Sequence, residues 1–101
     1  MGKNSDRESL IKVMANAIVH KIVAEHTNRP ESKHFLDSEV AEYTDQAKKI
    51  ADEHHWADED KEYIKEKALK KIKERMASRY PDVHFSEKEA KDLLDKEVSH
   101  L

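Results

Sequence analysis

The chain has 101 residues, of which 41% are charged and 37% are apolar, and its formal net charge is −3. It contains one glycine, two prolines and no cysteine. The lack of cysteine excludes a disulfide framework, a zinc–thiolate site and a cysteine nucleophile. The single glycine excludes a glycine-rich phosphate loop and disfavours the hairpin turns of a β sandwich or barrel.

Residue types that favour long helices dominate the chain. Ala, Glu, Lys, Leu and Arg supply 48 of the 101 residues, a composition typical of long helices or coiled coils. The sequence therefore predicts an all-α fold with a single domain over residues 1–101. We expect a small four-helix bundle with helices at about 6–28, 38–54, 58–80 and 87–100, because capping residues and prolines divide the chain there.

The first predicted helix is apolar over most of its circumference. Ser5-Asp6-Arg7-Glu8 is a capping-box sequence and predicts a start near Asp6. A helix that is apolar nearly all round must be buried on most sides. Two arrangements satisfy this: three other helices enclose it at the centre of the bundle, or it lies at a dimer interface. In the second arrangement, the residues that contact the partner are Leu10, Ile11, Met14, Ile18 and Ile22.

A loop is predicted over residues 28–36, because Pro30 disfavours helical backbone in the residue before it. Phe35 and Leu36 are expected to fold back from this loop onto the core. Asp37 or Ser38 then caps the second helix. At its far end, Trp56 is the only tryptophan, and we expect its large apolar area to plug the bundle with His54 beside it.

The last two helices have clear boundaries in the sequence. Asp58 is a candidate cap for the third helix, which must end before Pro81. Ser86-Glu-Lys-Glu89 is a second capping box, and Phe85 and Ala90 occupy the hydrophobic positions around it.

Charge is distributed unevenly along the chain. Residues 37–60 carry two basic and nine acidic side chains, whereas residues 61–80 carry eight basic and three acidic ones. We expect these two segments to attract each other within the fold or across a dimer. The basic segment also suggests phosphate contacts to nucleic acid from Lys67, Lys70, Lys71 and Arg75. Glutamates interrupt the lysines, so a solvated helix face is the preferred interpretation.

Seven histidines raise the question of a metal site. Glu-x-x-His, a spacing used in carboxylate-bridged bundles, occurs at Glu31/His34 and at Glu97/His100. Glu31 directly follows a proline, and about one such pair is expected by chance. The sequence thus predicts no metal site and no cofactor. It contains no nucleophile elbow either, and we expect no enzymatic activity.

Four short stretches carry a resemblance to a known family. They are Ala47-Lys-Lys-Ile-Ala51, Asp60-Lys-Glu-Tyr-Ile64, Ser86-Glu-Lys-Glu89 and Leu93-Leu-Asp-Lys-Glu-Val98. In this order, residues 47–101 resemble the soluble C-terminal region of LLH-type phage holins. The resemblance implies a prophage-encoded, holin-like accessory protein that acts beside a lysis system.

The function favoured by these patterns is a non-enzymatic helical protein-interaction module that self-associates. Its expected partner is a second copy, in a homodimer, or another helical protein. A small nucleic-acid-associated protein and the holin-like accessory protein are the alternatives. No apolar run approaches the roughly 20 residues of a membrane span, and the polar start lacks a signal peptide. We therefore expect a cytoplasmic protein without membrane insertion.

Overall fold

The computed structural model describes residues 2–27, 30–99 and 101. These residues form four helices and no strand: α1 (Lys3–His26), α2 (Pro30–Asp52), α3 (Asp58–Arg79) and α4 (Glu87–Val98). The predicted all-α fold with four helices is confirmed.

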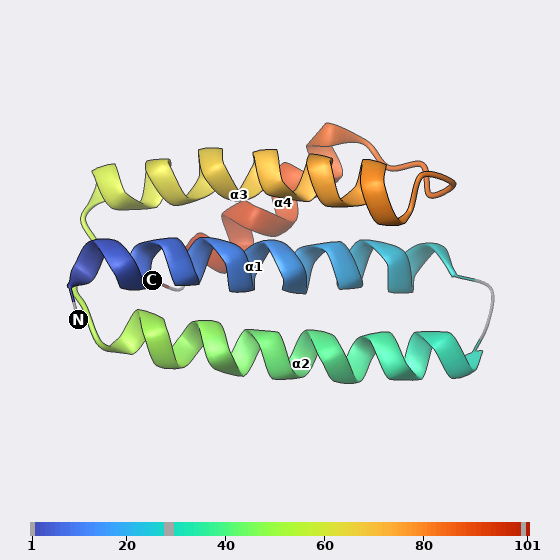
Figure 1. The fold of residues 1–101 in the computed structure, drawn as a ribbon, viewed down its shortest axis with the longest axis horizontal. Coiled ribbons are helices and arrows are strands. Elements are labelled where there is room, and N and C mark those ends of the chain that lie inside the picture. Colours follow the sequence, from blue (N-terminus) through green and yellow to red (C-terminus); the bar gives the residue numbers. More distant parts are fainter. Residues whose placement is uncertain (1, 28–29, 100) are drawn as a thin grey trace.

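Helix α1 is the centre of an elongated bundle that measures 40 × 23 × 21 Å. α2 and α3 run along opposite sides of α1, and the shorter α4 crosses behind α1 and α3 (Figure 1). Among the described residues, no Cα atom of α2 lies within 8 Å of one in α3 or α4. α2 thus packs mainly against α1.

The apolar circumference of α1 forms the core of this single chain. Five residues of α1 that were predicted to contact a partner are at most 3% exposed: Leu10, Ile11, Met14, Ile18 and Ile22. Side chains that their own chain encloses so fully cannot contact a second chain without unfolding. The sequence left two arrangements open, and the structure has the one in which the other helices of the same chain enclose α1. These five residues therefore belong to the core and not to a free surface.

The first two helices begin earlier than predicted. Gly2, not Asp6, is the N-cap of α1, and Asp6 lies in the first turn, where its carboxylate faces the positive end of the helix. α2 begins at Pro30, eight residues before the predicted start, because proline is well suited to the first helical position. Ser38 lies inside this helix, where its hydroxyl donates to the His34 carbonyl at 3.1 Å. Residues 28–29, part of the predicted loop, lie outside the described residues.

Because α2 replaces most of the predicted loop, Phe35 and Leu36 have different surroundings. Consecutive residues of a helix point about 100° apart, so both cannot face the same core. Leu36 is buried as predicted, but Phe35 is 63% exposed. The prediction that Phe35 folds onto the core is wrong.

α3 and α4 begin at the predicted residues, but Asp58, the candidate cap of α3, is its first helical residue and not its N-cap. α3 begins at Asp58 after the N-cap Ala57, whose backbone N–H donates to the Asp60 carboxylate at 3.2 Å. At the start of α4, the Ser86 hydroxyl accepts a hydrogen bond from the Glu89 backbone N–H at 3.0 Å. The predicted end of the last helix, residue 100, lies outside the described residues.

Candidate functional site

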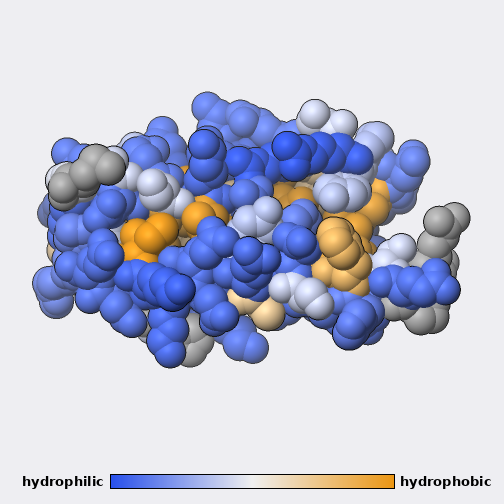
Figure 2. All heavy atoms as spheres, turned by 60° about the horizontal axis from the view of Figure 1, so that its bottom comes forward, coloured by the Kyte–Doolittle hydropathy of each residue, from blue (hydrophilic) through white to orange (hydrophobic). Residues whose placement is uncertain are grey.

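A groove of about 950 Å³ opens at the end of the bundle where α1 leads into α2. Its apolar lining comes from α1, α2 and the segment after α3: Val23, Phe35, Leu36, Tyr80, Pro81 and Val83. Its polar lining includes two acidic and two basic side chains: His26, Glu31, Arg79 and Asp82. Figure 2 shows apolar surface at this end of the molecule and a further apolar area toward the other end, amid a surface that is otherwise mostly hydrophilic.

Phe35 is the most unusual residue of this groove. Within residues 2–27, 30–99 and 101, it is the only large hydrophobic side chain that is exposed. It lies one residue from the buried Leu36, at the edge of an apolar hollow. Exposed apolar surface that borders a groove and has a polar rim is typical of a protein-interaction site.

A second candidate lies in the C-terminal half of α1, where His20 faces both neighbouring helices. Its ring lies 5.3 Å from the ring of Tyr43 in α2. Burial lowers the pKa of His20, and the positive charges of Arg79 and Arg75 in α3 lower it further, against the opposing charge of Glu39. The His20 Nδ1 atom and the Arg75 Nη1 atom are buried without a hydrogen-bond partner in the described structure. This environment disfavours the protonated form of the imidazole.

The lowered pKa of His20 predicts a loss of stability in acid. Near and below the ordinary histidine pKa of about 6.5, the unfolded chain binds a proton at His20 more readily than the folded chain does. The free energy of unfolding therefore decreases as the pH is lowered. We expect His20→Gln to reduce this loss between about pH 7.5 and 5.5, by less than about 1 kcal/mol because the ring is partly hydrated. Urea unfolding of the wild type and the variant at both pH values measures this difference. His55→Gln at an exposed site is the control, and an equal effect of the two variants would contradict the prediction.

The four residues predicted to contact phosphate do not share one environment. Lys67 lies over the ring of Tyr63, with its Nζ atom 5.7 Å from the ring centroid. Lys71 lines a small hollow between α1 and α3, and Arg75 is partly buried beside His20, where burial lowers its pKa. Only Lys70 of the four is exposed. Nucleic-acid binding through these residues stays a prediction.

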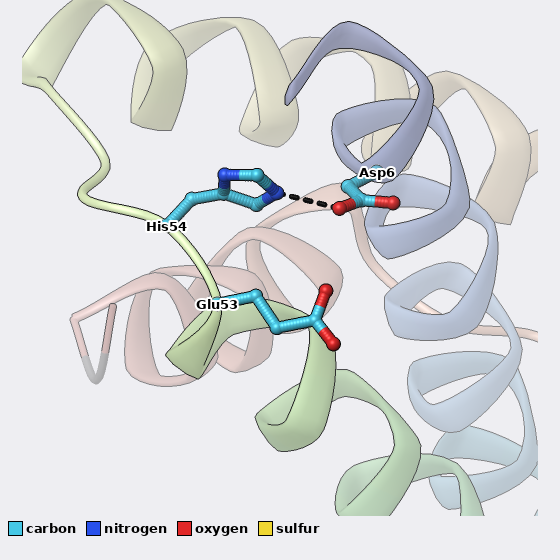
Figure 3. A group of neighbouring side chains, drawn as sticks. All are labelled: Asp6, Glu53 and His54. Atoms are coloured by element: carbon cyan, nitrogen blue, oxygen red, sulfur yellow. Dashed lines mark hydrogen bonds and ion pairs between the residues drawn. The ribbon is translucent and has the colours of Figure 1, made fainter. Parts of the chain in front are cut away.

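A third candidate lies at the opposite end of the bundle from the groove. Asp6 from the first turn of α1 meets Glu53 and His54, the two residues after α2 (Figure 3). The Nε2 atom of His54 lies 2.5 Å from the Oδ2 atom of Asp6. One donor atom from each of the three side chains lies within 4.8 Å of the other two. Imidazole nitrogen and carboxylate oxygen are both ligands of divalent transition metals.

The structure explains why His54 is held near Asp6. Trp56 is 4% exposed, and its indole N–H donates to the Ala51 carbonyl at 2.9 Å. The His54 ring packs edge-on against the indole, with the two centroids 5.5 Å apart. The predicted role of Trp56 as a plug with His54 beside it is confirmed.

Cations near this cluster are paired with a different carboxylate. Lys3 and Arg7 of α1 form ion pairs with Asp60 of α3 at 2.9 and 3.3 Å. The hydrogen bond from Lys3 is the main reason that the pKa of Asp60 lies below its ordinary value. Asp60 thus competes with Asp6 and Glu53 for the positive charges of α1.

Sequence reasoning did not find this cluster. Asp6 and Glu53 are 47 positions apart, and only the packing of α2 against α1 brings them together. Of the Glu-x-x-His pairs, Glu31 and His34 are both exposed, and Glu97 is half-buried beside the hollow between α2 and α4. His100 lies outside the described residues.

Comparison with protein-family models, curated proteins and solved structures finds no match for this chain. The resemblance of residues 47–101 to LLH-type phage holins therefore stays a prediction. Within the described helices, none combines the length and the apolar character that crossing a bilayer requires.

Proposed function

We propose that this protein is a non-enzymatic helical interaction module that self-associates through the groove beside Phe35. The observation that carries the proposal is the pairing of a projecting aromatic side chain, 63% exposed, with an apolar groove on the same surface. The first helix, the original candidate for this role, is enclosed by its own chain.

A second copy is the partner that fits this surface best. A two-fold interface requires a patch that is complementary to itself. Here each copy carries both a knob, Phe35, and a hollow lined by Val23, Leu36 and Val83, so two copies can exchange their knobs. The rim also carries both charge signs, which allows Glu31 of one copy to face Arg79 of the other.

The test is the effect of Phe35→Glu on self-association. Burying a phenylalanine contributes about 1.5–3 kcal/mol, and its replacement by a charge is expected to weaken the dimer by at least about 10- to 100-fold. Sedimentation equilibrium measures the dissociation constant. The matched control is Ala41→Glu, which adds the same charge at an exposed position of the same helix.

Two results would overturn the proposal. One is a wild-type protein that sediments as a monomer at high micromolar concentration. The other is a dimer that Ala41→Glu weakens as much as Phe35→Glu does, because the added charge alone would then explain the effect.

A further inference from the structure

We infer that Asp6, Glu53 and His54 form a binding site for a transition-metal ion of the zinc type, which would link the start of α1 to the end of α2. The inference is independent of the proposed self-association, because the cluster lies at the other end of the bundle from the Phe35 groove.

The geometry needs little adjustment to hold such an ion. Zinc binds nitrogen and oxygen ligands at about 2.0–2.2 Å in a tetrahedron, which places neighbouring ligand atoms about 3.3 Å apart. The three donor atoms lie within 4.8 Å of one another, so no pair has to close by more than about 1.5 Å. The distance between His54 Nε2 and Asp6 Oδ2, 2.5 Å, has to open by less than about 1 Å, since a metal ion replaces the shared proton.

Glu53 provides an observation beyond the His54–Asp6 pair. Its carboxylate has no hydrogen bond or ion pair within the described part of the chain, yet it extends toward the same space (Figure 3). An exposed glutamate without a partner can rotate onto an ion at little energetic expense. Glu53 therefore supplies the third ligand without breaking any contact of the fold.

The surroundings also favour a cation. Lys3 and Arg7 lie close by, but both are engaged by Asp60, so the negative charges of Asp6 and Glu53 are not cancelled by them. The packing of Trp56 against His54 restricts the imidazole before any ion binds. Ligands held in place in this way need less ordering when the ion binds.

The donor set selects the class of metal. One imidazole and two carboxylates suit zinc and its neighbours, whereas calcium takes six to eight oxygen ligands and magnesium an octahedron of oxygens. Three protein ligands leave a fourth position for water, which is typical of a zinc site that is not fully closed.

Titration of the tag-free protein with zinc chloride, followed by calorimetry, tests the inference. We expect one ion per chain with a micromolar dissociation constant, and weaker binding in acid, where protons compete for the ligands. Zinc at about 100 times the dissociation constant is expected to raise the Tm by roughly 10–20 °C. Magnesium or calcium in tenfold excess is expected to leave zinc binding unchanged.

Matched variants separate this site from the other histidines and carboxylates of the chain. His54→Gln and Glu53→Gln are expected to weaken zinc binding at least about 10-fold, whereas the neighbouring exposed changes His55→Gln and Asp52→Asn are expected to change it less than about twofold. Glu53→Gln is the decisive variant, because the Glu53 carboxylate makes no hydrogen bond or ion pair within the described part of the chain, so the Tm without zinc should stay as in the wild type. Equal losses in His54→Gln and His55→Gln, unchanged binding in Glu53→Gln, or no saturable binding below about 1 mM zinc would each overturn the inference.

Discussion

Replacement of Ile22 by alanine is expected to lower the free energy of unfolding by about 3–4 kcal/mol. Ile22 is fully buried where α1 passes through the centre of the bundle. Truncating a buried isoleucine loses its transfer free energy and also leaves a cavity that the surrounding helices fill only in part. Urea unfolding followed by circular dichroism measures the change.

The control and the concentration dependence make this result decisive. Ile50→Ala in α2 truncates the same residue type where it is only partly buried, and we expect a loss of about 1 kcal/mol. Because the single chain encloses Ile22, the loss of unfolding free energy caused by Ile22→Ala should be the same at two protein concentrations about 100-fold apart. An effect that appears only at the higher concentration would mean that a second chain, and not this one, covers α1.

Much of the fold could be predicted from local sequence signals. The capping box before α4 and the apolar circumference of α1 depend on a few neighbouring residues, and both of these predictions are confirmed. The predicted start of α3 at Asp58 is also confirmed, but Asp58 as its cap is wrong, because Ala57 is the N-cap. The start of α2 was missed because proline has two opposite effects: it ends a helix that approaches it and favours one that begins with it. The sequence alone did not show which effect prevails at Pro30.

The candidate sites were harder to predict because they depend on tertiary packing. Phe35 was expected in the core, and its exposure follows from the helical backbone that places Leu36 inward instead. His54 was expected beside Trp56, but its partner Asp6 is 48 positions away, and only the antiparallel arrangement of α1 and α2 makes them neighbours. Sequence spacing carries no information about such a pair.

Within this single chain, the predicted attraction between the acidic and the basic segment is not observed, and attraction across a dimer stays a prediction. The acidic α2 and the basic α3 lie on opposite sides of α1, and no ion pair joins them within the described residues. The basic side chains of α3 instead contact α4: Lys65 lies 3.3 Å from Asp95, and Lys73 lies 2.8 Å from Glu87. These pairs raise the pKa of Lys65 and lower that of Glu87. All four side chains are substantially hydrated, so each pair adds little to the stability of the fold.

Trp56→Ala is expected to be the second strongly destabilising change, with a loss of about 3–5 kcal/mol in the free energy of unfolding. The indole is 4% exposed and closes the end of the bundle between α2 and α3. Its loss removes the largest apolar side chain of the core, the hydrogen bond to Ala51 and the surface on which His54 packs.

Trp56→Phe separates packing from hydrogen bonding at this position. Phenylalanine keeps an aromatic ring but lacks the indole N–H, and we expect a loss of about 1–2 kcal/mol from the unsatisfied Ala51 carbonyl and the smaller ring. Urea unfolding followed by circular dichroism suits both variants, because neither retains tryptophan fluorescence. A loss below about 1 kcal/mol for Trp56→Ala would contradict the role of this residue as a plug. A destabilisation of Trp56→Phe equal to that of Trp56→Ala would mean that the hydrogen bond, and not the buried ring, holds the junction between α2 and α3.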